Sequence, residues 1–312
     1  MSISIIIPVY NRADIVADTL RSVASQTYRH IHLILVDNNS SDSTLTVLHN
    51  FKQQHQADDF HITVLQEKQP GAAAARNCGL RAADTDWVMF FDSDDIMQPD
   101  LLESYAKTIN ANPYADIIVT RVTNEMLNGS IRDLPYFESD IFANHIIHCT
   151  LSTIRYIARR ERFVEVGAWD CTQKIWDDYE LGVRLLLRMP TIAFVGDKSR
   201  ITIKSRESSI SGTDFSSRHK LCEYALDTIE HHISQSMHLQ RERLLKLTDY
   251  RRVVLAAHYQ SEGHADLARQ LYGKVIRRYT SSPLISTMFA AAYTYISHGG
   301  RGFGRLIRLI VR

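Results

Sequence analysis

The sequence lacks several features that would place it in common protein classes. Its four cysteines form no C-x-x-C pair and no zinc-ligand spacing among 312 residues, which predicts reduced thiols in a cytoplasmic protein. No apolar run reaches the roughly 18–20 residues that a membrane-spanning helix requires, and the longest, at residues 284–297, is interrupted by Ser, Thr and Tyr. The opening stretch MSISIIIPVYNR has no charged leader, so we expect no signal peptide.

The chain also has little net charge. Its formal charge of +1 lacks the basic excess of general nucleic-acid-binding proteins, so we expect no nucleic-acid partner. The charge is unevenly spread, because residues 213–312 hold 15 Lys and Arg against eight Asp and Glu, which leaves −6 for residues 1–212. The content of 45% hydrophobic residues is enough for a large core. After Gly212 the residues become almost all helix-compatible, with little Gly or Pro. This change predicts a main domain over 1–212 and a helical region over 213–312.

Short β-branched runs alternate with helix-compatible segments through the first 120 residues. Strands are expected at residues 4–9, 31–37, 61–65, 87–91 and 116–120. Helices are expected between them, near residues 13–26, 43–56, 72–83 and 99–111. Continuous apolar strands separated by helices indicate an α/β fold with a mainly parallel sheet covered on both faces, and such sheets bind ligands at the carboxyl ends of their strands. Further along, we expect a turn at 167–170, a helix at 176–189 and strands at 191–195 and 200–204.

Three aspartates follow the predicted strand WVMFF within four positions: Asp92, Asp94 and Asp95. One of the last two could cap a helix that begins near Pro99, but a cap needs a single carboxylate and closely spaced carboxylates repel one another. A hard divalent cation, Mn²⁺ or Mg²⁺, would offset that repulsion. Such ions take one or two protein carboxylates and fill their other positions with phosphate oxygens and water. A D-x-D pattern alone is a weak signal, because many proteins contain one by chance.

Other predicted strand ends also carry distinctive polar residues. Asp37 closes the second strand, where a carboxylate can accept a hydrogen bond from a nucleobase imide, while the polar run after it predicts an Asx turn and a helix cap. After the third strand, GAAAARNCG opens a helix. It reads either as an ordinary alanine-rich helix or as one that places Arg76 against a diphosphate. We favour the second, because this helix begins beside the aspartate-bearing strand.

Four stretches resemble the family 2 glycosyltransferases, which are inverting enzymes with the GT-A fold: SIIIPVYNR, VDNNSSDST, GAAAARNCGL and MFFDSDD, in this order and at these spacings. The likeness covers roughly residues 2–212. It implies that a nucleoside-diphosphate sugar, usually a UDP-sugar, binds along the first strand and its loop, at Pro8, Tyr10, Asn11 and Arg12. It further implies that Asp37 contacts the base, that Asp92 and Ser93 lie near the ribose, and that Asp94 binds the metal.

The same resemblance implies a catalytic base at Asp178, in the stretch WDDYEL, where Asp177 stands at a position usually held by glutamate. From the residues alone, an aspartate pair at a helix start could merely favour the helix dipole, but neighbouring carboxylates also raise one another's proton affinity. Family members commonly carry a histidine in a later segment where this chain has Arg206. We expect Arg206, with Lys204, to stabilise the diphosphate leaving group; a surface-loop arginine is the alternative.

The C-terminal region contains one helical hairpin with tetratricopeptide-like spacing, LAAHYQSEGHADLARQLYGKVIRRY. A solenoid needs about three such repeats, so we expect a helical appendage. The chain ends GGRGFGRLIRLIVR, in which apolar residues alternate with arginines. Residues 299–312 are expected either to lie in a membrane interface or to dock on the protein. Membrane contact would suit a lipid-linked glycan acceptor at the inner face of the cell membrane.

The residues and the resemblance together predict an inverting, metal-dependent glycosyltransferase of the hexosyltransferase type, acting on a glycan or lipid-linked glycan as in surface polysaccharide synthesis. A nucleotidyltransferase would show a glycine-rich phosphate loop near the first strand, and a dinucleotide oxidoreductase would show G-x-G-x-x-G after a strand; the sequence contains neither. A non-catalytic glycan-binding or scaffold protein that keeps the fold is the remaining alternative. The presence of Asp37, Asp92, Asp94 and Asp178 argues against it.

Overall fold

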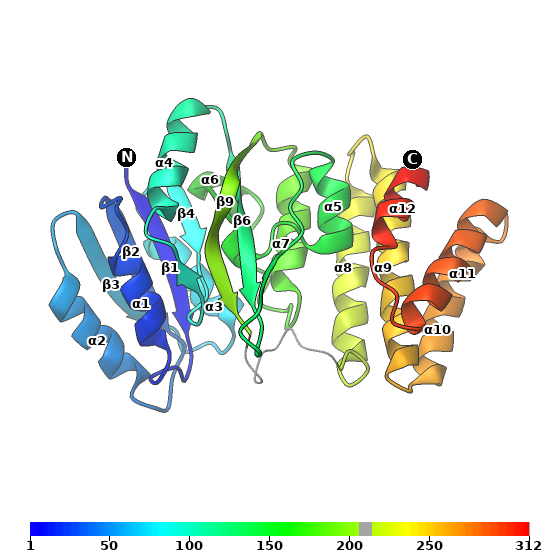
Figure 1. Ribbon diagram of the computed structural model, residues 1–312, viewed down its shortest axis with the longest axis horizontal. Helices are drawn as coiled ribbons and strands as arrows, with labels where there is room; N and C mark the ends of the chain where they lie inside the picture. The colour runs from blue at the N-terminus through cyan, green and yellow to red at the C-terminus, as the bar shows by residue number, and fades with distance from the viewer. Residues whose placement is uncertain (206–213, 312) are drawn as a thin grey trace. The chain divides into compact units, whose positions relative to one another are not determined.

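The computed structural model describes residues 1–205 and 214–311 (Figure 1). The chain forms two compact units, and each unit is made of three separate stretches of the sequence. The first unit takes in residues 1–138, 151–181 and 188–209, and the second takes in 139–150, 182–187 and 210–312. The predicted boundary after Gly212 lies outside the described residues and stays a prediction.

The first unit begins with the parallel half of a sheet, as the sequence predicts. Its strands lie in the order β3-β2-β1-β4 and are β1 (Ile3–Val9), β2 (Ile31–Asp37), β3 (Phe60–Gln66) and β4 (Trp87–Phe90). The connecting helices are α1 (Val16–Ala24), α2 (Thr44–His55) and α3 (Ala72–Ala82). All seven residues of β2 are buried, because helices cover both faces of this sheet (Figure 1). Val9 and Asp37 are register partners, so the carboxyl ends of β1 and β2 lie side by side.

The second half of the sheet is mixed rather than parallel. The order continues from β4 through β8 (Tyr156–Arg159), β6 (Ile117–Glu125), β9 (Ile192–Lys204) and β5 (Ile96–Met97), while β7 (Ile131–Asp133) pairs with β6. Strand β8 is antiparallel to both β4 and β6, so the parallel run stops at β4. The two strands predicted at 191–195 and 200–204 are one strand, because β6 pairs along both parts and a register shift near Thr120 absorbs the residues between them.

The remaining helices of this unit are α4 (Leu101–Ala111), the 3₁₀ turn η1 (Thr153–Arg155), α6 (Arg160–Glu165) and the first part of α7 (Asp177–Leu187). Helix α4 begins after Asp100, so the alternative reading, in which Asp94 or Asp95 caps a helix near Pro99, does not hold. Helix α3 packs very close to β1, since a Cβ atom at Gly79 would lie only 2.4 Å from Ile6 Cγ2. Only glycine permits that approach. The close packing places the helix that carries Arg76 directly against the sheet.

The second unit is helical. Its elements are α5 (Ile141–His148), α8 (His219–Gln235), α9 (Arg241–Ser261), α10 (Ala265–Ile276), η2 (Arg277–Tyr279), α11 (Pro283–Ser297) and α12 (Gly304–Ile310). Helix α9 is central and packs against α5, α8, α10, α11 and α12. Its buried Arg252 pairs with Asp227 at 2.7 Å, Glu230 at 2.6 Å and Asp249 at 3.0 Å, which ties α8 to α9. The predicted helical hairpin is present as α9 and α10. Among the described residues, no helix is both long and apolar enough to cross a membrane.

Candidate active site

The carboxyl ends of β1 and β2 are joined by a network of short polar contacts. Asn11, in a left-handed conformation with φ 49°, accepts a 2.8 Å hydrogen bond from the Ser41 amide. Asn38 donates from its side-chain amide to the carbonyls of Glu67 and Gln69 at 3.0 and 2.7 Å, and accepts from the Gly71 amide at 2.7 Å. The loops after β1, β2 and β3 are therefore fixed to one another before any ligand binds.

Asp37 lies in this network as a buried acid, with only 1% of its surface exposed. Its Oδ2 accepts a 3.3 Å hydrogen bond from the Ser40 amide, whereas its Oδ1 has no partner among the described residues. A buried carboxylate oxygen without a donor costs free energy, and such groups cluster at sites that a ligand completes. The missing donor is therefore the feature of Asp37 that points to a bound partner.

The three aspartates after β4 have three different environments. The side chains of Asp92 and Asp94 are 35% and 29% exposed, and Asp94 Oδ2 lies 4.0 Å from the Arg12 guanidinium. Asp95 is 4% exposed and accepts a 3.2 Å hydrogen bond from the Lys204 backbone amide, so it holds strand β9. The neighbouring Ser93 is also buried. Two carboxylates of the cluster thus face accessible space and the third supports the loop.

Arg76 is the centre of the site. It is 6% exposed, and its Nη2 donates to Asp92 Oδ1 at 2.9 Å while its Nη1 donates to Asp177 Oδ2 at 2.8 Å. The guanidinium also stacks on the Trp169 ring, with its carbon 4.4 Å from the ring centroid. Burial would lower the pKa of Arg76, but Asp177 and Asp92 outweigh it and hold that pKa above its ordinary value. One buried cation therefore joins the loop after β4 to the start of α7.

Trp169 and Asn77 are two site residues that sequence reasoning missed. Asn77 donates to the Trp169 carbonyl at 2.8 Å and accepts from the Trp169 amide at 2.9 Å, a two-way clamp between α3 and the turn at 167–170. That turn, which the sequence predicts, contains Gly167 and Ala168 with positive φ. The available signal was the adjacent Arg76-Asn77 pair. Arg76 contacts the ring of Trp169, and Asn77 binds the backbone of the same residue.

Asp178 lies at the first turn of α7, half-buried beside Asp177. Its Oδ2 accepts a 3.4 Å hydrogen bond from the Thr153 amide and its Oδ1 accepts one of 2.8 Å from the Tyr179 amide. Burial raises the pKa of Asp178 to about 6, and the Asp177 charge adds to the rise while Arg76 opposes it. A carboxylate with a pKa near 6 is ionised at neutral pH and is also basic enough to take a proton from a reacting hydroxyl.

The acids at this edge suit a hard cation held with help from a substrate. The exposed carboxylates of Asp92 and Asp94 are oxygen donors of the kind that Mg²⁺ and Mn²⁺ prefer. No group of three or more metal-binding side chains occurs in the parts of the chain that the structure describes. Two carboxylates match an ion that completes its coordination with phosphate oxygens and water, rather than a cage built only from protein.

The comparison with known proteins agrees with this geometry. Residues 4–164, just over half of the chain, match the sequence profile of glycosyl transferase family 2. The chain belongs to this family. It is therefore a glycosyltransferase, as the four sequence stretches predict. The matched segment runs from β1 through α6, and so contains Asp37, Arg76 and the aspartates after β4 but ends before Asp178.

Relatives of this glycosyltransferase include several curated bacterial proteins. An uncharacterized glycosyltransferase of Haemophilus influenzae is 28% identical over 229 residues, which cover 71% of this chain and 75% of the relative. The putative teichuronic acid biosynthesis glycosyltransferase TuaG of Bacillus subtilis is 39% identical over 101 residues, 32% of this chain and 39% of TuaG. Poly-beta-1,6-N-acetyl-D-glucosamine synthase of Staphylococcus epidermidis is 28% identical over 195 residues, 59% of this chain and 46% of the synthase. The last two matches cover less than half of those proteins.

Solved structures identify the fold as GT-A. Staphylococcus aureus TarS residues 1–349, in complex with UDP-GlcNAc, superposes with a TM-score of 0.72 at 18% identity, covering 100% of this chain and 89% of that one. The mannosyltransferase PcManGT of Pyrobaculum calidifontis, in complex with GDP-Man and Mn²⁺, gives a TM-score of 0.54 at 16% identity, covering 95% and 87%. The predicted fold class is confirmed, including its C-terminal helices.

The structure gathers most of the predicted site residues at one edge of the sheet. Arg12 approaches Asp94, and Arg76 connects Asp92 with the acid pair of α7. Pro8 lies within β1, and Tyr10 is 58% exposed just beyond its end. Lys204 ends β9, where its backbone amide binds Asp95. Arg206 lies outside the described residues. The roles assigned to these side chains stay predictions.

Proposed function

We propose that this glycosyltransferase moves a sugar, with inversion, from a UDP-sugar to a hydroxyl of a glycan or lipid-linked glycan, as in surface polysaccharide synthesis. The observation that carries the proposal is Asp178, a half-buried carboxylate with a pKa raised to about 6. It lies beside Asp177, which shares Arg76 with Asp92 of the loop after β4. A base and the predicted donor-binding loop are thereby connected through one side chain.

The nucleotide would bind along the loops after β1 and β2. Asp37 Oδ1, buried and without a donor among the described residues, would accept the imide N–H of uracil. The side chains of Tyr10, Asn11 and Arg12 follow β1, and they would line the nucleotide with Pro8. The names of two relatives, TuaG and the N-acetylglucosamine polymer synthase, support a surface-polysaccharide acceptor. The UDP-GlcNAc bound by TarS supports a uridine donor.

In the transfer step, Asp178 takes the proton of the acceptor hydroxyl while the hydroxyl oxygen forms a bond to the anomeric carbon. The bond from that carbon to the diphosphate breaks on the opposite side, and the diphosphate leaves with its electron pair. Asp177 keeps Asp178 basic through charge repulsion, and Arg76 limits that effect, so the base stays ionised near neutral pH. The prediction that Arg76 contacts the diphosphate gives way here to a positioning role, since its Nη atoms already donate to Asp92 and Asp177.

Mn²⁺ or Mg²⁺ fits the carboxylates of Asp94 and Asp92. When bound, the cation would supply positive charge that neutralises the leaving diphosphate. The Arg12 guanidinium, 4.0 Å from Asp94, offers a second positive group at the same place. Lys204 and Arg206 remain candidates for the far side of the diphosphate. We also propose that the enzyme works in the cytoplasm at the inner face of the cell membrane, and that residues 299–312 contribute to membrane contact there.

A donor panel tests the proposal. The purified full chain is mixed with UDP-glucose, UDP-galactose, UDP-GlcNAc and GDP-mannose, with Mn²⁺ or with a chelator, and its thermal transition is measured. A donor present at 100 times its Kd should stabilise the protein by about 2.7 kcal/mol, and a uridine donor should do so only with the metal. Release of UDP is then followed with glycan and lipid-linked glycan acceptors. If no nucleotide sugar raises the transition and none is hydrolysed or transferred, the non-catalytic alternative replaces this proposal.

A further inference from the structure

Helix α12 docks on the second unit with one face and leaves the other exposed. Ile307 is fully buried and Val311 is 2% exposed, whereas Leu306 and Leu309 are 48% and 65% exposed. The helix therefore buries part of its apolar surface against α9 and presents two leucines outward. The expectation that the tail docks on the protein holds for this buried face, and the expectation that it lies in a membrane interface stays a prediction.

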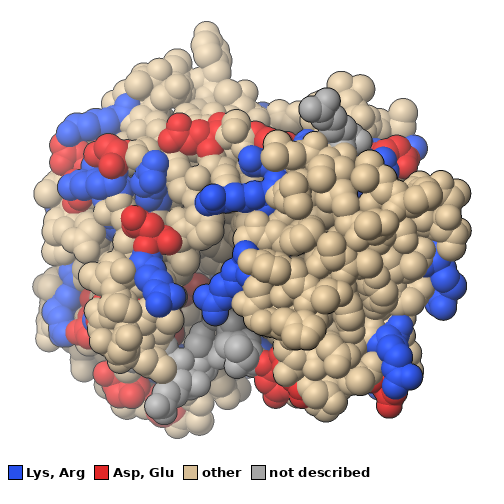
Figure 2. Space-filling view, turned by 45° about the vertical axis from the view of Figure 1, so that its right-hand side comes forward, with Lys and Arg blue, Asp and Glu red and all other residues tan. Residues whose placement is uncertain are grey.

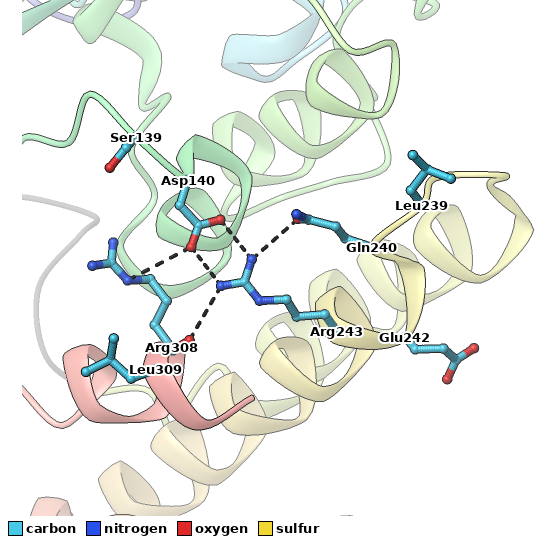
Figure 3. Close-up of a pocket in the computed structure, with 8 residues that line it drawn as sticks. All are labelled: Ser139, Asp140, Leu239, Gln240, Glu242, Arg243, Arg308 and Leu309. Atoms are coloured by element: carbon cyan, nitrogen blue, oxygen red, sulfur yellow. Dashed lines mark hydrogen bonds and ion pairs between the residues drawn. The ribbon is translucent and has the colours of Figure 1, made fainter. Parts of the chain in front are cut away.

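Arg243 holds the tail in that orientation (Figure 3). It donates to both carboxylate oxygens of Asp140, at 2.9 and 2.7 Å, and its Nε donates to the Val311 carbonyl at 3.0 Å. Arg308 donates to Asn144 at 2.8 Å from within α12. One guanidinium thus connects the start of α5, the start of α9 and the end of α12. These contacts tie α12, which carries the exposed leucines, to α5 and α9.

The turn between α8 and α9 adds two more exposed apolar side chains beside the tail. Met237 and Leu239 are 95% and 97% exposed. Leu239 and Leu309 line the same open cavity of about 610 Å³ from opposite sides, with Asp140, Gln240 and Arg243 between them (Figure 3). We call Met237, Leu239, Leu306 and Leu309 the C-terminal apolar surface. Each of these residues would be expected to avoid water, yet none is covered.

The last part of the chain carries charge of one sign. The last acidic residue is Asp266, and the 46 residues after it hold eight Lys and Arg and no Asp or Glu. Arg301 and Arg305 are exposed near the leucines of α12. Helix α11 contains no charged residue, and Figure 2 shows a broad face without acidic or basic side chains over the C-terminal helices. Glu242 and Asp140 line the cavity beside Leu239, where Asp140 is paired with Arg243, so the turn carries both signs of charge. Around α12 the exposed charges are arginines, and apolar groups flanked by arginines are the composition of a segment that binds anionic bilayers.

We propose that the C-terminal apolar surface inserts into the headgroup boundary of an anionic lipid bilayer. The proposal extends the membrane contact put forward above, but it is independent of the transfer chemistry. Side chains that are 95–97% exposed touch almost nothing of their own protein, so they protrude. Protruding leucine and methionine side chains enter a fluid interface readily, whereas a folded partner would need a matching pocket for each. The arginines then meet lipid phosphates as the apolar side chains enter.

Vesicle flotation of the full chain tests this surface. Vesicles contain phosphatidylcholine alone or with a third of phosphatidylglycerol. The double variants Leu306→Asp with Leu309→Asp, and Met237→Asp with Leu239→Asp, separate the tail from the turn. Leu127→Asp is the matched control, because Leu127 is 67% exposed in the first unit. We expect binding to the anionic vesicles only, weakened tenfold or more in each double variant and unchanged in the control.

Three results would overturn the proposal. The first is absence of wild-type binding to anionic vesicles. The second is full binding by the turn variant, which would contradict the part of the proposal that includes Met237 and Leu239. The third is a dimer in light scattering that the tail variant dissociates, with no vesicle binding, which would assign the surface to a second copy of the chain. Donor-induced thermal stabilisation is measured in every variant. Its loss in all of them, wild type included, would contradict the transferase proposal rather than this one.

Discussion

Arg76 donates a 2.8 Å hydrogen bond to Asp177, which lies 101 residues further along the chain. Through this contact the alanine-rich helix α3 reaches the acid pair at the start of α7. Because Arg76 also binds Asp92 at 2.9 Å, the loop that would hold the donor and the helix that would hold the base share one cation. The electrostatics of Asp178 therefore depend on residues from three separate parts of the sequence.

Opposite substitutions in this network should move the pH profile in opposite directions. Arg76 lowers the pKa of Asp178 and Asp177 raises it. In Arg76→Gln the acidic limb of the kcat profile should shift to higher pH, because a stabilising positive charge is lost. In Asp177→Asn it should shift to lower pH, because a repelling charge is lost. Transfer rates measured from pH 5 to 9 check both; shifts of the same sign would contradict the network.

Arg76→Gln also leaves two carboxylates without their cation. Removing one partner from a fully buried pair costs about 3–5 kcal/mol, and the cost here should be smaller because Asp92 and Asp177 keep partial exposure. Chemical unfolding measures that cost separately from the pH profile. Arg76→Lys is a useful second variant, because it keeps the positive charge but cannot donate to Asp92 and Asp177 from two separate nitrogen atoms.

Asp94→Ala should remove metal-dependent donor binding without unfolding the protein. The Asp94 side chain is 29% exposed, and ion pairs that reach water contribute little, so its loss should change stability by about 1 kcal/mol or less. Transfer should fall about 100-fold or more, since a positive group at the diphosphate is lost. Asp86→Ala is the matched control, because exposed Asp86 precedes the same strand at its opposite end. Calorimetric titration of UDP with Mn²⁺ distinguishes them; equal affinities in the two variants would remove Asp94 from the metal site.

Asp37→Ala should weaken UDP binding and yet leave the ligand-free protein at least as stable. Oδ1 of Asp37 has no partner among the described residues, so the substitution removes a buried carboxylate and gives up only the 3.3 Å bond from the Ser40 amide to Oδ2. In the complex the same oxygen would bind the uracil imide, and its loss should cost about tenfold in Kd. Calorimetry with UDP and thermal unfolding without it measure the two effects. A strongly destabilised variant would mean that Asp37 acts in folding instead.

Arg243→Gln should loosen α12 while leaving transfer from a soluble acceptor intact. This substitution removes the bond to the Val311 carbonyl and the paired bonds to Asp140. Hydrogen exchange should accelerate about tenfold or more at the amides of residues 304–310, because each lost charge-assisted bond is worth about 1.5–3 kcal/mol. Arg241→Gln, two residues away and paired only at the surface with Glu242, should leave that exchange unchanged. Equal protection in both variants would show that the Arg243 contacts do not hold the tail.

Much of the first half of the fold follows from the sequence. β2 is apolar except for His32 and its last residue, Asp37, because both faces of the parallel sheet are covered, and its predicted bounds, Ile31–Asp37, agree with the structure. Strand β8 could not be anticipated, since four residues carry too little pattern and its neighbours, β4 and β6, are set by tertiary pairing. For the same reason, β9 appears in the sequence as two runs separated by the polar residues that lie at its bulge.

The site was predictable as a set of residue types rather than as a set of contacts. Asp37 and the aspartates after β4 are at strand ends, where sequence pattern is informative. The contact between Arg76 and Asp177 joins residues with no periodic relation, so no spacing rule would find it. Trp169 resembled a turn residue, and its role as the platform under Arg76 depends on Asn77 clamping its backbone. The two carboxylate partners of Arg76, on which its proposed positioning role rests, could likewise not be found from its place in the sequence.

The stability of the protein should report on Asp178 as well. Its folded-state pKa of about 6 lies above the ordinary value of 3.8, so proton binding favours the folded state. The stability that Asp178 contributes is thus present below about pH 4 and is lost as the pH rises through about 6. Asp178→Asn, which cannot ionise, should therefore gain stability over the wild type at pH 8 and not at pH 4.

The central claim, that Asp178 is the catalytic base, is tested most directly by UDP release from Asp178→Asn at saturating donor, metal and acceptor. Asparagine keeps a similar shape and an acceptor oxygen but cannot take the proton. The account predicts that acceptor-dependent release falls about 10²–10⁴-fold while the Kd for UDP stays within a factor of about two. Wild-type release by Asp178→Asn, with the donor bound as tightly as before, would contradict it.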